Sequence, residues 1–207
     1  MTNPWLSIPL SDYEAHMALP EVAQARLLAD IFATLLETHR PASVAVIGCA
    51  GGNGFDCIDP TVTQRVVGVD INPDYIDAAR QRHAGRIANL ELITADIQDG
   101  AVSFAPVELI YAALLFEYVD GKRTLECLRA LLTPDGILAT VVQVAGGKMV
   151  TPTPYLSLEA LGPVMRVVDI DDLAASACDA GLRELHRRRT RSPGGKDFDV
   201  QVFQVNS

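Results

Sequence analysis

Short apolar runs alternate with segments of helical periodicity along most of the chain. Such runs are typical of strands that are buried on both faces of a parallel sheet. They occupy 43–47, 65–69, 90–94, 107–115 and 137–144. Apolar residues recur at helical spacing in 21–40, after Pro73 and in 120–132. Strands that alternate with helices in this order predict a doubly wound, mostly parallel α/β sheet with helices on both faces.

The last forty residues depart from this pattern. Asp169 can cap a helix over 170–180, and Gly181 can end it. Two strands, 182–191 and 198–205, are then joined by the turn signal Ser192-Pro193-Gly194-Gly195, which predicts an antiparallel hairpin. In the second strand the apolar residues alternate as far as Val202 and then continue at Phe203 and Val205, one step out of phase.

The organisation of the chain predicts one domain over 1–207, because no linker or repeat divides it. We expect an amino-terminal arm and helix, a cofactor-binding core, a covering segment, and a last helix with the hairpin. These parts are 1–41, 43–144, 145–168 and 169–207. The arm contains three prolines within its first twenty residues, which predicts an irregular or partly helical segment.

Charge and composition favour a small-molecule partner. The formal net charge of −9 makes nucleic acid and an anionic membrane surface unlikely partners, since both are bound through Lys and Arg. The four cysteines form no C-x-x-C pair and the four histidines are scattered, so we expect no metal site. We find no signal-peptide pattern and no apolar run long enough to span a membrane, and therefore expect a cytoplasmic protein with free thiols.

A glycine-rich loop follows the first strand directly, with the sequence Gly48-Cys49-Ala50-Gly51-Gly52-Asn53-Gly54. Glycine lets the backbone turn sharply and approach a ligand closely, and open α/β sheets bind nucleotides at this position. Asp70 ends the second strand, 22 positions after Gly48, where a carboxylate can hold the hydroxyls of a ribose. Asp96 ends the third strand, where it can accept a hydrogen bond from an adenine amino group.

The motif order resembles that of class I S-adenosylmethionine-dependent methyltransferases, which have a Rossmann-like fold. The resemblance is carried by VAVIGCAGGNG, VVGVDINPDYIDAAR, ITADI, ELIYAALLFEYVD and LLTPDGILATVVQ. It covers about Ser43 to Val144, roughly half the chain, and it implies a seven-stranded sheet whose last strand is antiparallel. It also implies S-adenosylmethionine as cofactor and S-adenosylhomocysteine as product. An NAD-binding Rossmann fold is the competing interpretation, but no frame of the loop supplies G-x-G-x-x-G.

By this resemblance the glycine loop would shape the methionine pocket and Asp70 would bind the ribose. Asp96 and Ile97 would bind the adenine, with Ile71 on the other ring face. The loop residues concerned are Gly48, Ala50, Gly52, Asn53 and Gly54, and Ala113 and Leu114 would line the sulfur region. The sequence departs from the family pattern at Val46, where an acidic residue is common. Because only 55–63 separate the loop from the second strand, the helix there must be short.

A sulfonium methyl group is already activated, so the enzyme needs mainly in-line alignment of the acceptor and a base for its proton. Glu117 is a candidate base and Tyr118 a candidate partner of the cationic sulfur, although capping and packing explain both equally well. In the arm, Tyr13 and His16 are further candidates if the arm covers the pocket; a solvent-exposed helix start is the simpler explanation. The apolar residues of 145–165 could wall a substrate pocket or pack in the core.

One basic cluster, 187–191, leaves a second substrate class open. It could bind RNA phosphates or an acidic substrate, or its arginines could line a solvated strand edge that discourages aggregation. The sequence thus favours methyl transfer to a small molecule. The alternatives are an RNA or protein methyltransferase that uses this cluster, and a non-catalytic subunit that only binds the cofactor. The apolar arm and covering segment could support a homodimer.

Overall fold

Seven strands form one sheet in a computed structural model that describes residues 3–100, 102–144 and 151–206. The strand order is β3-β2-β1-β4-β5-β7-β6. The first five strands pair in parallel, and β7 runs antiparallel to both of its neighbours. The strands are β1 (Ser43–Ile47), β2 (Arg65–Asp70), β3 (Leu90–Thr94), β4 (Val107–Ala113), β5 (Leu132–Gln143), β6 (Leu182–Arg191) and β7 (Asp197–Val205). The predicted fold class, a mostly parallel seven-stranded sheet with an antiparallel carboxyl-terminal hairpin, is confirmed.

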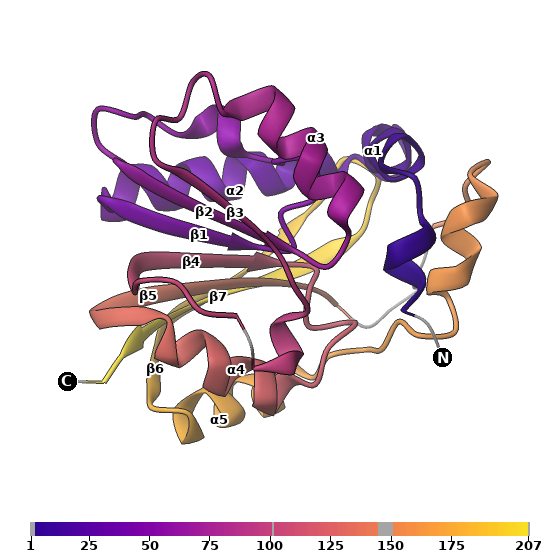
Figure 1. The fold of residues 1–207 in the computed structure, drawn as a ribbon. Helices are drawn as coiled ribbons and strands as arrows, with labels where there is room; N and C mark the ends of the chain where they lie inside the picture. Colours follow the sequence, from indigo (N-terminus) through magenta and orange to yellow (C-terminus); the bar gives the residue numbers. More distant parts are fainter. Residues whose placement is uncertain (1–2, 101, 145–150, 207) are drawn as a thin grey trace.

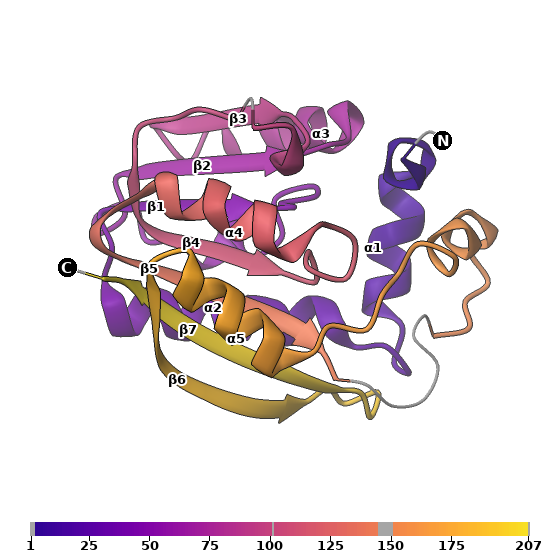
Figure 2. The same ribbon diagram turned by 90° about the horizontal axis from the view of Figure 1, so that it is seen from below.

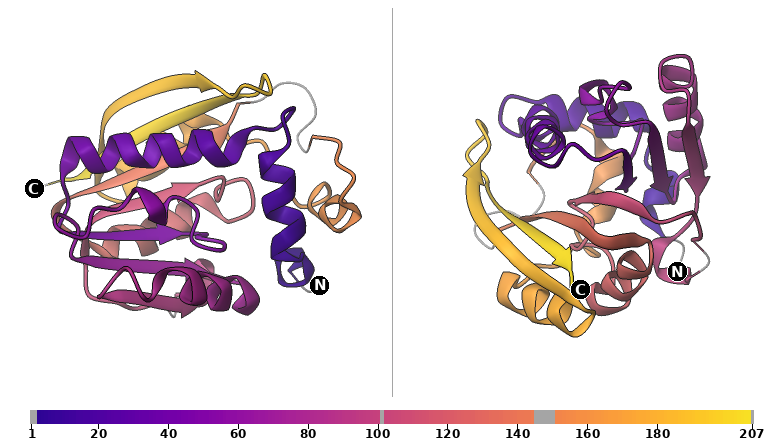
Figure 3. Two further views of the ribbon diagram at one scale, coloured as in Figure 1. Left: turned by 90° about the horizontal axis from the view of Figure 1, so that it is seen from above. Right: turned by 90° about the vertical axis from the view of Figure 1, so that its left-hand side faces the viewer.

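Helices cover both faces of the sheet, as Figure 1 shows. Because successive side chains of a strand point to opposite faces, β1 places Val44 and Val46 in one apolar cluster and Ala45 and Ile47 in the other. The first cluster lies under α2 (Gln24–His39) and α3 (Pro73–His83), and the second under α4 (Gly121–Ala130) and α5 (Ile170–Asp179). Figure 3 shows α2 running along its face of the sheet.

Helix caps predicted from the sequence are present. The Asn72 side chain accepts a hydrogen bond from the Asp74 N–H at 2.9 Å, with Pro73 in the first turn of α3. The Asp169 carboxylate likewise accepts from the N–H groups of Asp171 and Asp172 and begins α5. These short polar side chains satisfy amide groups that have no partner within the helix, and they fix where each helix begins.

The carboxyl-terminal hairpin explains the shift in the apolar pattern of β7. Pairing of β5 with β7 is continuous, and the irregularity lies in β6, between Glu184 and His186. Phe198 and Val202 therefore face the first cluster, while Phe203 faces the second. The apparent step out of phase arises because β7 is buried on both faces, and not from a bulge in that strand.

The connection from β1 to β2 has no α-helix between Gly48 and Gln64, all of which the structure describes. A single turn of 3-10 helix, η2 (Phe55–Cys57), stands there instead. The Arg86 guanidinium donates to the carbonyl oxygens of Phe55 and Ile58. The Phe55 carbonyl also accepts the Ile58 N–H, which closes the 3-10 turn. The short helix expected from the sequence is thus reduced to one turn.

The amino-terminal arm lies across the carboxyl ends of the parallel strands, beside η4 (Leu156–Leu161), in Figures 1 and 2. The arm consists of η1 (Pro4–Ser7) and α1 (Leu10–Ala18). The Ser157 hydroxyl donates to the Asp12 carboxylate at 2.6 Å, and the Asn72 amide donates to the Trp5 carbonyl at 2.8 Å. These contacts place the arm against the ends of the sheet. In the described ranges, no helix is both long and apolar enough to cross a membrane.

We predict that Phe198→Ala lowers the free energy of unfolding by about 3–5 kcal/mol, because it leaves a cavity in the core. Phe198 is fully buried in β7, with an exposed fraction of 0%. Urea unfolding followed by circular dichroism measures the change. Leu185→Ala, in the paired strand β6, is the control, since Leu185 is 40% exposed and its truncation should cost about 0.5 kcal/mol or less. Equal effects of the two substitutions would contradict the assigned register.

Candidate active site

The loop after β1 turns through left-handed backbone conformations. Gly48 and Gly52 have φ angles of 73° and 90°, which glycine adopts without strain. Ala50 has a φ of 47° and Leu114, after β4, a φ of 53°, although both carry a Cβ. Left-handed conformations at such residues cost about 1–2 kcal/mol and concentrate at functional sites. Both residues line the same cavity.

Asp70 holds this loop in place from the end of β2. Its carboxylate accepts the Ala50 N–H at 2.8 Å through one oxygen and the Asn72 N–H at 2.9 Å through the other. Burial raises the pKa of Asp70, and the hydrogen bonds from backbone amides act in the opposite direction. A carboxylate has about four acceptor positions, so two bonds leave capacity for a ligand.

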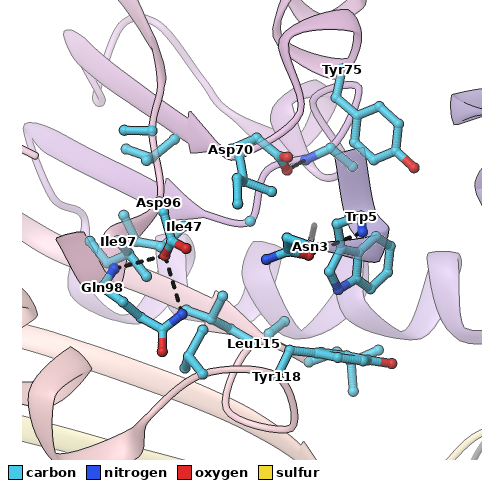
Figure 4. Close-up of a pocket in the computed structure, with 18 of the residues that line it drawn as sticks. Asn3, Trp5, Ile47, Asp70, Tyr75, Asp96, Ile97, Gln98, Leu115 and Tyr118 are labelled. Atoms are coloured by element: carbon cyan, nitrogen blue, oxygen red, sulfur yellow. Dashed lines mark hydrogen bonds between the residues drawn. The ribbon is translucent and has the colours of Figure 1, made fainter. Parts of the chain in front are cut away.

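A first cavity of about 90 Å³ lies between the ends of β1, β2, β3 and β4. Figure 4 shows Asp70 and Asp96 at neighbouring strand ends, with Trp5 across the cavity from Asp96. Asp96 accepts the Gln98 N–H at 2.9 Å and begins η3 (Ile97–Asp99). Eight of the predicted cofactor residues line this cavity. They are Gly48, Ala50, Asp70, Ile71, Asp96, Ile97, Ala113 and Leu114.

Three other predicted loop residues lie on a different surface. Gly52, Asn53 and Gly54 line a cleft of about 540 Å³ between the loop, α1 and the end of α3. The Arg82 guanidinium forms an ion pair with Glu14 across this cleft, with Nη2 and Oε2 3.0 Å apart. The left-handed turn at Ala50 and the missing α-helix direct the second half of the loop away from the first cavity.

The sequence did not identify several residues of the arm, of α3 and of the strand ends as part of the site. They are Asn3, Trp5, Tyr75, Gln98 and Leu115. Trp5 makes edge-to-face contacts with Tyr13 and Tyr118, at ring-centroid distances of 5.7 and 5.1 Å. The sequence feature that could have indicated the arm is its aromatic content, since two aromatic side chains lie within its first thirteen positions.

A second cavity of about 60 Å³ adjoins the first. The residues that line both cavities are Trp5, Tyr13, Leu114 and Tyr118. All four predicted catalytic residues therefore come together here: Glu117 and His16 line the second cavity alone, and Tyr13 and Tyr118 line both. Burial raises the pKa of the Tyr13 and Tyr118 hydroxyls, so both phenols are neutral at physiological pH.

Glu117 is buried, with an exposed fraction of 1%. One carboxylate oxygen, Oε1, accepts the Gln143 N–H at 2.7 Å, and the other, Oε2, has no hydrogen-bond partner among the described residues. Burial raises the pKa of Glu117 to about 7. His16 is also buried, its Nδ1 lacks a partner in the described part of the chain, and burial lowers its pKa. Buried polar atoms normally have partners, so these two indicate a site for a ligand.

Three of the four arginines in the 187–191 cluster of β6 are paired with carboxylates. Arg187, Arg189 and Arg191 each lie within 2.8 Å of an acidic side chain. The partners are Asp171, Asp199 and Asp197. These pairs neutralise the charge that a phosphate backbone would need. The described residues contain no group of three or more His, Cys, Asp or Glu side chains that could hold a metal ion.

Comparison with known proteins finds a matching domain family and solved structures with the same fold. The sequence model of a family described as a methyltransferase domain matches residues 44–136. No curated protein sequence matches the chain significantly. Among solved structures, the N-methyltransferase NodS from Bradyrhizobium japonicum WM9, in complex with S-adenosylhomocysteine, aligns with a TM-score of 0.64 and 18% identity. That alignment covers 97% of this chain and 90% of NodS.

Two further structures show the range of this fold. Magnesium protoporphyrin IX methyltransferase (ChlM) from Synechocystis PCC 6803 aligns with a TM-score of 0.66 and 13% identity, over 89% of this chain and 84% of ChlM. The [4+2]-cyclase SpnF aligns with a TM-score of 0.69 and 13% identity, over 89% of this chain and 82% of SpnF. At these identities the alignments establish the fold.

Residues 44–136 therefore match a methyltransferase domain, and the chain shares the fold of structures that include S-adenosylmethionine-dependent methyltransferases. The resemblance recognised in the motifs is thereby confirmed for the matched domain and for the fold. The matched region, 44–136, contains the glycine loop, both aspartates and Glu117. The arm and the hairpin lie outside it.

The buried Glu117 predicts a specific dependence of stability on pH. Its folded-state pKa of about 7 exceeds the ordinary 4.5, so the native state holds this proton more tightly than the unfolded state. This contribution to stability is complete below about pH 4.5 and is lost as pH rises through about 7. Between about pH 5 and pH 8, the stability of the parent protein should fall by roughly 2–3 kcal/mol relative to Glu117→Gln.

Chemical unfolding of both proteins across this pH range measures the difference. Glu126→Gln, at an exposed position of α4, is the matched control, and its stability curve should run parallel to that of the parent protein. If the stability curve of Glu117→Gln also ran parallel to that of the parent protein, Glu117 would be ionised at no cost in the free energy of unfolding.

Proposed function

We propose that this enzyme transfers the methyl group of S-adenosylmethionine to a nitrogen or oxygen atom of a small molecule held in the second cavity. The observation that carries the proposal is the junction of the two cavities at Trp5, Leu114 and Tyr118. In-line displacement requires the acceptor and the sulfonium to meet along one axis, and adjoining cavities with a shared wall provide that arrangement.

The first cavity has groups that suit the cofactor. The free acceptor positions of Asp70 can take the ribose hydroxyls, and Asp96 can take the adenine amino group, with Ile71 and Ile97 on the ring faces. Gly48 and Ala50 can bring main-chain atoms to the methionine part. The rings of Trp5 and Tyr118 can face the positive sulfur, because aromatic faces attract cations.

The arm controls access to this cavity. About 90 Å³ is well below the roughly 300–1,000 Å³ typical of ligand pockets, and Asn3 and Trp5 of the arm are among its walls. Binding of the cofactor therefore involves outward movement of the arm. Its return would exclude water from the reacting groups, as covering segments do in many enzymes.

The cofactor supplies a methyl group on positively charged sulfur. Transfer of this methyl group to the acceptor would leave the electron pair of the carbon–sulfur bond on sulfur. The acceptor loses its N–H or O–H proton to the free oxygen of the Glu117 carboxylate, so that charge and atoms balance. A base with a pKa near 7 is suited to this transfer at physiological pH.

The alternatives remain open to experiment. Arg187, Arg189 and Arg191 of β6 are paired with carboxylates, which argues against an RNA substrate. A cyclase shares this fold, so binding of the cofactor without turnover over a broad acceptor panel would favour a different reaction or a non-catalytic subunit. A homodimer, the division of 1–207 into the parts given above, and a cytoplasmic location stay predictions.

Calorimetric titration with S-adenosylhomocysteine tests the cofactor site. We expect micromolar binding, weakened by roughly ten- to a hundredfold in Asp70→Asn, because a charge-assisted hydrogen bond contributes about 1.5–3 kcal/mol. Asp77→Asn, on the exposed side of α3, is the matched control and should bind as the parent protein does. Absence of binding by the folded parent protein, or tight binding of NAD in its place, would contradict the proposal.

Fluorescence gives an independent test, because Trp5 is the only tryptophan in the chain. Since Trp5 lines both cavities, S-adenosylhomocysteine should change its emission with the affinity found by calorimetry. Trp5→Phe should abolish the signal and retain calorimetric binding within about tenfold, since one aromatic contact contributes about 0.5–1.5 kcal/mol. Calorimetric binding without any change in emission would place Trp5 away from the cofactor.

A further inference from the structure

The second cavity contains a cation that the sequence did not indicate. Lys196, the residue before β7, lines it together with Glu117 and His16. The three residues come from segments far apart in the chain: the hairpin, the loop after β4, and α1. Lys196 is partly buried, and this burial lowers its pKa.

The hairpin turn fixes the position of Lys196. The Ser192 N–H donates to the Lys196 carbonyl at 2.8 Å and closes the turn. Gly194 packs so closely on the chain before α2 that a Cβ there would collide with the Glu21 carbonyl oxygen. The turn is therefore docked against the segment that follows α1, and it carries Lys196 to the cavity edge.

Gln143, at the end of β5, connects the cation with the buried carboxylate. Its side-chain oxygen accepts a hydrogen bond from Lys196 Nζ at 3.1 Å, while its backbone N–H donates to Glu117 Oε1 at 2.7 Å. Glu117 Oε2 and His16 Nδ1, in contrast, have no partner among the described residues. The cavity therefore has a cation at one position and two unsatisfied polar atoms at others.

The remaining walls are largely apolar. Leu158 and Leu161 of η4 are buried against Ile8 of the arm, and Met165 lines the cavity after them. Apolar walls with a few convergent polar groups are typical of small-molecule sites, where the polar groups fix the orientation of the ligand. The body of the ligand should thus be apolar and its ends polar.

We propose that the acceptor is a small organic anion with an apolar body, an inference that rests on the proposed methyl transfer. Its anionic group pairs with Lys196 Nζ, and its N–H or O–H donates to Glu117 Oε2. A carboxylate fits this site better than a phosphate does. Phosphate sites generally contain several hydrogen-bond donors or a bidentate arginine, whereas Lys196 provides one ammonium group that acts as a point charge. Lys196 would thereby determine specificity, and Glu117 would accept the proton.

Paired ligands that differ only in charge test this inference. The probes are 4-hydroxybenzoate and 4-aminobenzoate against their primary amides, with 4-hydroxyphenyl phosphate as the phosphate arm. Binding is measured by calorimetry with and without saturating S-adenosylhomocysteine. We expect the carboxylates to bind at least tenfold more tightly than the amides and also more tightly than the phosphate. Tighter binding of the phosphate would overturn the carboxylate assignment.

Lys196→Met should remove this preference and Lys196→Arg should retain part of it, at unchanged melting temperature. Lys122→Met, at an exposed position of α4, is the matched control and should keep the full preference. Equal binding of acids and amides, no binding of any acid at millimolar concentration, or a preference that survives Lys196→Met would overturn the inference. Binding of S-adenosylhomocysteine separates the two proposals, because its failure removes the cofactor site whatever the acids do.

Discussion

The Asp70 carboxylate accepts one N–H from each of two turns, at Ala50 after β1 and at Asn72 before α3. Both turns meet at the carboxyl ends of parallel strands, where loops approach from either face of the sheet. Their amides would otherwise stay unsatisfied next to a cavity. The cost of burying this charge is thus offset by bonds that also position the loop.

The same contacts extend to the arm. Asn72, whose backbone bonds Asp70 and whose side-chain oxygen caps α3, donates through its side-chain nitrogen to the Trp5 carbonyl. Trp5 in turn contacts Tyr118, beside Glu117. A contiguous path therefore joins the Asp70 carboxylate to the second cavity. Closure of the arm on the cofactor would complete the wall of the second cavity, which favours an ordered reaction in which the cofactor binds first.

The strands, the caps and both aspartates could be predicted because each depends on local pattern: buried strands are continuously apolar, and Asn72 and Asp169 precede helices. The orientation of the loop beyond Ala50 could not, since it follows from one left-handed turn and a missing helix. Lys196 reaches the site only because the hairpin docks on the chain before α2. Contacts between segments so distant in sequence leave no periodic signal along the chain.

Charged side chains differ in their pairing between the surface and the cavities. Along β6, carboxylates on α5 and β7 match Arg187, Arg189 and Arg191, and ion pairs at the surface contribute little to stability. Glu117 is buried with one oxygen unmatched, at a cost in stability that an apolar side chain would avoid. A folded chain retains such a cost where a ligand supplies the missing partner. In the proposed reaction that partner would be the acceptor, whose proton the unmatched oxygen of Glu117 would receive.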